Sequence, residues 1–136
     1  MLEIYELNKK FGDKEVVKNI NFKVDAQEVL CILGPNGAGK STTINMLTGT
    51  LAPNGGKILF AGKPIQENLQ DYKQVLGVVP QEIALYEDLT ALQNITFFAS
   101  LYNIPKRKLN MKCMRALEYV GLGDRAKDRV KTYSGG

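Results

Sequence analysis

The chain has 136 residues, a formal net charge of +4, two cysteines and no histidine. This length suits one domain or a large part of one, with the charged and apolar fractions of a soluble globular protein. Two cysteines without histidine exclude a structural zinc site, which needs about four ligands, and they indicate no disulfide framework. The modest, scattered charge does not indicate a nucleic-acid partner.

The opening of the chain predicts a small antiparallel sheet. Leu2, Ile4 and Leu7 indicate a first strand, and residues 11–13 form a turn in which Gly and Asp tolerate unusual backbone angles. Residues 19–24 alternate between apolar and polar side chains, which is typical of a half-buried strand.

The next segment has a different pattern. Residues 29–33 form a continuous apolar run, which predicts a central parallel strand covered on both faces, with Cys31 as a small buried hydrophobe. Residues 40–47 then predict a helix that ends near Gly49. A turn at residues 53–56 precedes a short predicted strand over 57–60.

The second half of the chain is predicted to be mostly helical. A second apolar run at 76–79 predicts another core strand, ended by Pro80. Helical spacing then predicts one helix from Thr90, its N-cap, to Tyr102, and another from about Lys106 to Val120. We place the domain boundary between these patterns, giving residues 1–89 and 90–136.

One motif indicates chemistry. Residues 34–41 match G-x-x-x-x-G-K-S between an apolar run and a predicted helix, the setting that a phosphate-binding loop requires. Glycines let the backbone approach phosphate oxygens, and the helix N-terminus favours an anion. Lys40 is predicted to reach the β- and γ-phosphates, and the Ser41 hydroxyl to bind Mg²⁺. The loop alone leaves GTPases, kinases and motor ATPases open.

The amino-acid sequences of four segments narrow these classes of nucleotide-binding protein. Residues 34–42 resemble the Walker A motif of ATP-binding cassette (ABC) transporter ATPases, and residues 10–12 are similar to the adenine-stacking loop of that family. Residues 78–82 resemble its Q-loop, and residues 134–136 resemble the start of its LSGGQ signature. This resemblance implies an α/β fold: an incomplete P-loop NTPase core with an N-terminal antiparallel β subdomain and a helical subdomain.

The resemblance also implies roles for single residues. Phe11 would stack on adenine, and Val16 would line the base. Lys40 and Gln81 would take part in catalysis, with Ser41 and Gln81 at the Mg²⁺ ion. The implied residues that contact ATP are Phe11, Val16, Asn36, Gly37, Ala38, Gly39, Lys40, Ser41, Thr42, Ser134, Gly135 and Gly136.

Ser134 to Gly136 would cap the γ-phosphate of ATP held by a second ATP-binding subunit, so the resemblance implies a head-to-tail dimer. It further implies a transmembrane permease subunit as partner, and ATP hydrolysis coupled to transport. The segment 89–102 is similar to cassettes of the export type. The expected location is the cytoplasm, on the inner face of the cell membrane, with membrane contact only through the permease.

Several parts of the family pattern have no counterpart in these residues: the signature Gln, the Walker B Asp, the catalytic Glu, the D-loop and the switch His. We therefore expect a truncated chain that binds ATP without hydrolysing it at a normal rate. Missing strands would leave apolar edges unpaired, which favours pairing with another chain.

Two alternatives remain. The first is a soluble P-loop kinase or GTPase, against which the residues around Gln81 and the Ser-Gly-Gly end argue. The second is a cassette ATPase of DNA repair or translation that works without a permease; such proteins carry long insertions or a second cassette.

Overall fold

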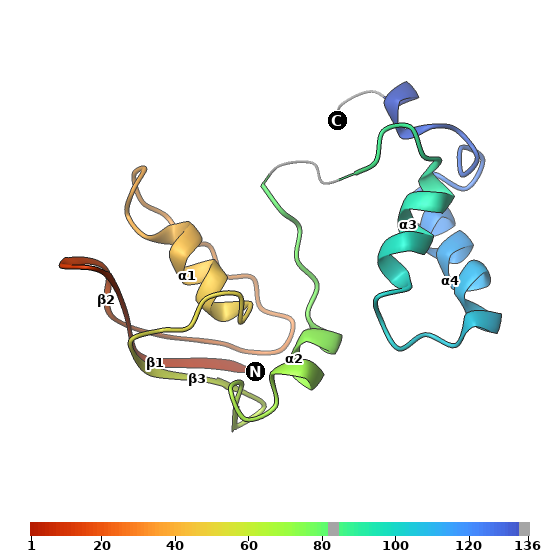
Figure 1. Ribbon diagram of the computed structural model, residues 1–136. Coiled ribbons are helices and arrows are strands. Elements are labelled where there is room, and N and C mark those ends of the chain that lie inside the picture. Colours follow the sequence, from red (N-terminus) through yellow and green to blue (C-terminus); the bar gives the residue numbers. More distant parts are fainter. Residues whose placement is uncertain (82–84, 134–136) are drawn as a thin grey trace. The chain divides into compact units, whose positions relative to one another are not determined.

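The computed structural model describes residues 1–81 and 85–133. The chain divides into two compact units, the first from Met1 to Val78 and the second from Val79 onward, and each is described by itself below (Figure 1). The division of domains at residues 89 and 90 that the sequence indicated stays a prediction.

The first unit contains a four-stranded antiparallel sheet in the order β2-β1-β3-β4. Its strands are β1 (Leu2–Phe11), β2 (Lys14–Val24), β3 (Gly55–Phe60) and β4 (Lys63–Pro64). Ile4 pairs with Phe22 on one side and with Ile58 on the other, so the central strand aligns apolar residues across the sheet. The predicted antiparallel sheet and its three strands are confirmed.

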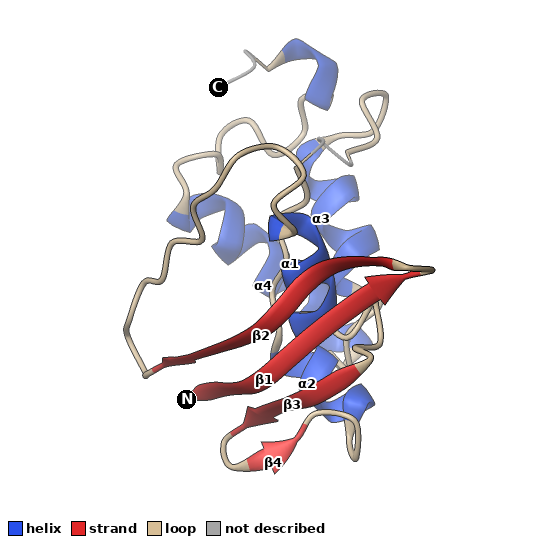
Figure 2. Ribbon diagram, turned by 90° about the vertical axis from the view of Figure 1, so that its left-hand side faces the viewer, coloured by secondary structure: helices blue, strands red, loops and turns tan. Residues whose placement is uncertain are grey.

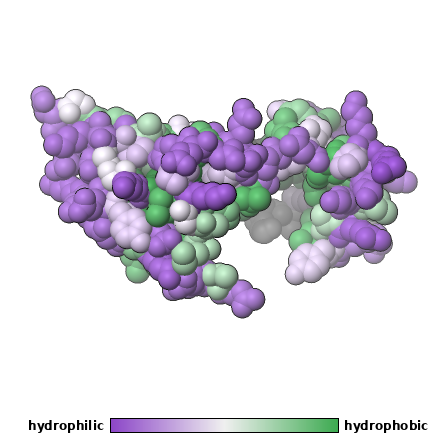
Figure 3. All heavy atoms as spheres, turned by 90° about the horizontal axis from the view of Figure 1, so that it is seen from below, coloured by the Kyte–Doolittle hydropathy of each residue, from purple (hydrophilic) through white to green (hydrophobic). Residues whose placement is uncertain are grey.

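Helix α1 (Lys40–Leu47) lies against one face of this sheet (Figure 2). Met46 of the helix packs in one core with Ile4, Leu7 and Ile58, and all four side chains are almost completely buried. The opposite face of the sheet is largely hydrophilic (Figure 3). One-sided burial explains the alternating pattern of the strands.

Helix α2 (Leu69–Val75) closes the end of this core. Tyr72 is buried, and its hydroxyl donates a hydrogen bond to the carbonyl oxygen of Leu47 at 2.7 Å. The ring of Tyr72 also lies 5.3 Å from that of Phe60, centroid to centroid. These contacts connect α2 to the end of α1 and to β3.

Two predicted strands were wrong. Residues 29–33 form no strand, with Val29 and Leu33 each 89% exposed and Cys31 exposed rather than buried. Residues 76–79 also form no strand, and Val79 is 95% exposed. A strand needs a neighbour for its backbone hydrogen bonds, and no strand of the described ranges pairs with either segment. An apolar run reports a tendency to be buried, not the presence of that neighbour.

The second unit is helical. It contains α3 (Ala91–Ala99), α4 (Lys106–Tyr119) and a short 3₁₀ helix, η1 (Val130–Thr132). Both predicted α-helices are confirmed, although α3 ends before Tyr102. Their shared core contains Ala91, Leu117 and Ala126. Among the described residues, no helix combines the length and apolarity needed to cross a membrane.

Thr90 begins α3 as predicted. Its hydroxyl accepts a hydrogen bond from the Gln93 N–H at 3.1 Å, and the Gln93 side chain accepts one from the Thr90 N–H at 2.9 Å. This reciprocal arrangement is a capping box. At the end of α4, Gly121 adopts a φ of +75°, as expected for a residue that closes a helix.

Asn94 of α3 holds the preceding loop. The side chain is only 3% exposed, its oxygen accepts a hydrogen bond from the Tyr86 N–H at 2.8 Å, and its nitrogen donates to the Tyr86 carbonyl at 2.9 Å. Lys131 of η1 holds the same loop by a 2.7 Å contact with Asp88, which lowers the pKa of that carboxyl group.

Replacing Ile58 by alanine tests the core of the first unit. Ile58 is fully buried between β1 and α1, so we expect Ile58→Ala to lower the free energy of unfolding by about 2–5 kcal/mol. Leu59→Ala, on the opposite side of the strand and only half-buried, is the matched control. Urea unfolding followed by circular dichroism measures both, and equal losses would contradict the proposed one-sided core.

Replacing Asn94 by leucine tests the loop anchor. Asn94→Leu leaves the N–H and carbonyl of Tyr86 without their side-chain partners, so we expect a loss of about 1–3 kcal/mol in the second unit. The same change at the exposed Asn110 of α4 is the control, with an expected effect within about 0.5 kcal/mol. Thermal unfolding compares the two variants. If Asn94→Leu leaves the stability unchanged, the hydrogen bonds of Asn94 do not stabilise the second unit.

Candidate functional site

Two glycines shape the loop at residues 34–41. Gly37 has a φ of +83° and Gly39 a φ of +89°, in the left-handed region that side chains disfavour. Gly39 is the N-cap of α1, and the helix begins at Lys40 as predicted. The sequence therefore has glycines where the backbone must turn sharply before it enters the helix.

Gly39 is also pressed against β2. A Cβ atom added there would lie 2.7 Å from the Val16 carbonyl oxygen and 3.1 Å from a methyl group of Val17. Real Cβ atoms essentially never approach a backbone oxygen so closely. Position 39 thus requires glycine both for its backbone angle and for its contact, and this contact fixes the loop to the sheet.

The start of α1 presents free backbone donors. The first bond of the helical ladder runs from the Thr43 N–H to the Gly39 carbonyl at 2.8 Å, and the Thr43 hydroxyl donates to the same oxygen at 2.9 Å. The N–H groups of residues 40–42 precede this bond and have no acceptor within the helix. The first turn carries no acidic side chain, so its partial positive charge is not neutralised.

Lys40 spans the loop. Its ammonium donates hydrogen bonds to the carbonyl oxygens of Gly34 at 2.7 Å and Pro35 at 2.8 Å. A bond from a cation to a charged phosphate oxygen is stronger than one to a neutral carbonyl, so a phosphate entering the loop can compete for this ammonium. Ser41, the next residue, is exposed.

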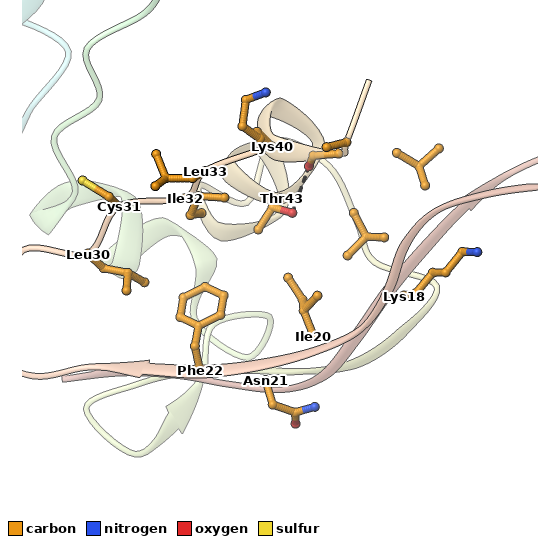
Figure 4. A pocket seen from close by; sticks show the side chains of 14 residues that line it. Lys18, Ile20, Asn21, Phe22, Leu30, Cys31, Ile32, Leu33, Lys40 and Thr43 are labelled. Atoms are coloured by element: carbon orange, nitrogen blue, oxygen red, sulfur yellow. Dashed lines mark hydrogen bonds between the residues drawn. The ribbon is translucent and has the colours of Figure 1, made fainter. Parts of the chain in front are cut away.

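An apolar cavity of about 580 Å³ lies beside the loop, between it and β2. Figure 4 shows Ile20, Phe22 and Leu30 directed into this space, whereas Lys18 and Asn21 point away from it. Most of the lining side chains are apolar and would not compensate the desolvation of a phosphate, but Ala38, Gly39 and Lys40 of the loop also line the cavity. The N–H groups at the start of α1 and the Lys40 ammonium are the groups of this region that suit an anion, whereas Ile20, Phe22 and Leu30 suit an apolar group.

The remaining predicted residues lie in several places. Phe11 ends β1 and is 51% exposed, while Val16 is half-buried and lines the apolar cavity. Gln81 is exposed and belongs to the second unit, whereas the loop belongs to the first. Residues 134–136 lie outside the described residues. The structure shows Gly37 to Ser41 as one continuous loop and helix start, and all the site assignments stay predictions.

Sequence reasoning missed two residues that support the loop. Val17 packs on Gly39 and is 4% exposed, and Thr43 is 5% exposed with its hydroxyl on the Gly39 carbonyl. The position of Thr43, four residues after Gly39 in a predicted helix, was a readable signal, because threonine hydroxyls often bond to that carbonyl. Nothing in the sequence pairs Val17 with Gly39.

Replacing Gly39 by alanine tests the contact with β2. The added methyl group would collide with the Val16 carbonyl, so we expect a destabilisation of about 1–3 kcal/mol and a loss of ATP affinity through the displaced loop. Gly37→Ala is the control, because Gly37 has a similar φ but open space around its Cβ position. Fluorescence titration with an ATP analogue measures both, and a greater loss in Gly37→Ala would contradict the assigned contact.

The chain is similar to known proteins in sequence and in fold. The family model for the ABC transporter matches residues 17–136. The linearmycin resistance ATP-binding protein LnrL of Bacillus subtilis is 43% identical over 136 residues, covering 100% of this chain and 44% of that protein. The probable multidrug ABC transporter ATP-binding protein YbhF of Escherichia coli is 42% identical over 122 residues, covering 90% of this chain and 21% of that protein.

The fold is similar to that of cbiO1 from Clostridium perfringens, described as part of the ABC transporter complex cbiONQ. The TM-score is 0.85 at 29% identity, and the match covers 98% of this chain and 55% of that one. The chain thus spans about half the length, or less, of these known proteins. The phosphate loop, the partial ATPase fold and the match over residues 17–136 agree, and the chain belongs to the ABC transporter ATP-binding family.

Proposed function

We propose that residues 34–42 bind the triphosphate of ATP together with Mg²⁺. The observation that carries this proposal is the fixed start of α1, where Gly39 is held against β2 and Lys40 bridges the loop. The N–H groups of residues 40–42 supply donors and the Lys40 ammonium supplies charge. Ser41 is exposed and adjacent, so its hydroxyl is available to the metal ion.

The base would stack on Phe11. This ring is half-exposed at the end of β1, in the same unit as the loop, and an aromatic face binds a purine without specific hydrogen bonds. Val16 precedes the buried Val17 on β2, and we assign it a secondary apolar contact with the base. The two residues thereby extend the site from phosphate to adenine.

The site would be completed by residues from elsewhere. Gln81 would bring its side-chain oxygen to Mg²⁺ and the attacking water, with the second unit as its carrier. Ser134, Gly135 and Gly136 would contact the γ-phosphate held by a second ATP-binding subunit in a head-to-tail dimer. Because the site would combine residues of two units and of two subunits, ATP would control the association of these parts.

The proposed partner in the membrane is a permease. Tyr86, Phe97 and Phe98 form a ring cluster on the second unit, with centroids of Tyr86 and Phe97 5.3 Å apart. Tyr86 and Phe97 are 51% and 44% exposed, so two rings of this cluster offer apolar surface to a partner. Exposed aromatic clusters are typical of interaction surfaces, and the buried Asn94 fixes the backbone beneath Tyr86.

In this proposal the chain is part of a subunit that couples ATP binding and hydrolysis to export across a membrane. Relatives named for linearmycin resistance and multidrug transport favour export. The subunit would lie in the cytoplasm against the inner face of the membrane, joined to it by the permease.

Hydrolysis by these 136 residues alone would be slow. Positioning the attacking water in phosphoryl transfer needs a base or an orienting group as well as the metal. The family's catalytic Glu and switch His have no counterparts here, and the chain contains no histidine. We therefore assign binding to this stretch of the protein and fast turnover to residues of a complete cassette.

Replacing Lys40 by methionine tests the proposed phosphate site. Because this removes the one ammonium that bridges the loop, we expect ATP affinity to fall at least about tenfold, by the strength of a charge-assisted bond. Lys57→Met, which removes the same charge from the exposed face of β3, is the control. Calorimetric titration with ATP and Mg²⁺ measures both variants, and equal affinities would reject the site. Hydrolysis is tested separately: rapid phosphate release by the unmodified chain would reject the assignment of slow hydrolysis.

A further inference from the structure

The turn that carries Phe11 is fastened to the chain after α1. The Lys10 N–H donates to the Asn54 side-chain oxygen at 2.8 Å, and the Asn54 N–H donates to the Asn8 carbonyl at 3.0 Å. These bonds join residues more than forty positions apart. The end of β1 is therefore held in place although it lies at the tip of a hairpin.

Lys9 adds a contact to the ring itself. Its ammonium donates to the Ala52 carbonyl at 2.6 Å and lies 5.3 Å from the centroid of the Phe11 ring. In the described part of the chain, no carboxylate lies within ion-pair distance of Lys9, in contrast to Lys10, which faces Glu15 at 3.9 Å. The Lys9 ammonium is thus directed to a carbonyl and a ring.

We propose that Lys9 is a positioning residue for the base of the nucleotide, acting by holding Phe11 from one side so that its other side receives adenine. This rests on the proposed adenine-stacking function of Phe11. A half-exposed ring at a hairpin tip would otherwise rotate, and fixing it beforehand lowers the entropy lost on binding. An ammonium on one side also draws ring electron density toward itself, which reduces repulsion between the other side and a purine.

This role differs from general attraction between a cation and phosphates. A cation that acted on the triphosphate would strengthen binding of ATP and of inorganic tripolyphosphate alike. A residue that acts through Phe11 strengthens only the ligand that has a base. The ratio of the two affinities therefore distinguishes the two roles, and a purely structural role would change unfolding without changing that ratio.

The experiment uses the full chain and measures dissociation constants for ATP and tripolyphosphate with Mg²⁺. Lys9→Met keeps the length of the side chain and removes its charge, and we expect ATP to bind about two- to fivefold more weakly, as for a partly exposed cation–π contact. Tripolyphosphate should bind unchanged. Lys9→Arg keeps a cation over the ring and should restore ATP affinity. Lys57→Met, which removes an exposed lysine charge from β3, is the control and should leave both ligands unaffected.

Phe11→Ser separates this inference from the proposed function. Stacking of a base on an aromatic ring strengthens binding roughly tenfold. Phe11→Ser should therefore lower the affinity for ATP by about that factor. In that background, Lys9→Met should have no further effect on ATP. If Phe11→Ser binds ATP normally, the adenine function of Phe11 is wrong and the inference fails with it. If Phe11→Ser weakens ATP binding but Lys9→Met does not, only the role of Lys9 is overturned. The same holds if Lys57→Met weakens ATP binding as much as Lys9→Met does.

Discussion

The contact between Gly39 and the Val16 carbonyl is the constraint on which the site depends. It places the start of α1 against β2 so closely that no side chain fits between them. The helix in turn contributes Met46 to the core of the sheet, so the loop cannot shift without disturbing Ile4 and Leu7. For the proposed anion site, this packing would hold the backbone N–H groups in one direction before any phosphate binds.

The features that could be predicted from the sequence are those set by residues close together along the chain. The antiparallel strands, the start of α1, the Thr90 cap and the glycine after α4 follow from local periodicity and turn chemistry, and all appear in the structure. The run at residues 29–33 shows the limit of such reasoning. Its apolarity predicted a buried strand, and this prediction was wrong: in the described residues the run forms no strand, and Val29 and Leu33 are 89% exposed.

Side-chain pairings across long distances in sequence could not be predicted from one sequence. The capping threonine of α3 was visible because its partner lies three residues away. The partners of Lys9 and Lys10 are Ala52 and Asn54, and no local pattern connects them. For the same reason the start of α1 after the glycine loop was predicted, whereas the support that Val17 gives to Gly39 had to be found in three dimensions.

The proposed site would bind the phosphates and the base of the nucleotide by different interactions, and both parts of the site are attached to the β1–β2 hairpin. The phosphate end relies on backbone donors and the Lys40 ammonium, and it is fixed to β2 through Val16. The base end relies on the Phe11 ring, which closes β1 just before β2 begins. The pairing of Phe11 with Lys14 therefore sets where the ring stands relative to Val16. A paired hairpin changes length only by whole residues, and each such change also turns side chains to the other face of the sheet. The register of β1 against β2 shifts between Lys9 and Lys10 and again between Leu7 and Lys9. In the proposed site, these irregularities and the pairing of Phe11 with Lys14 would together set the distance from the base to the phosphates.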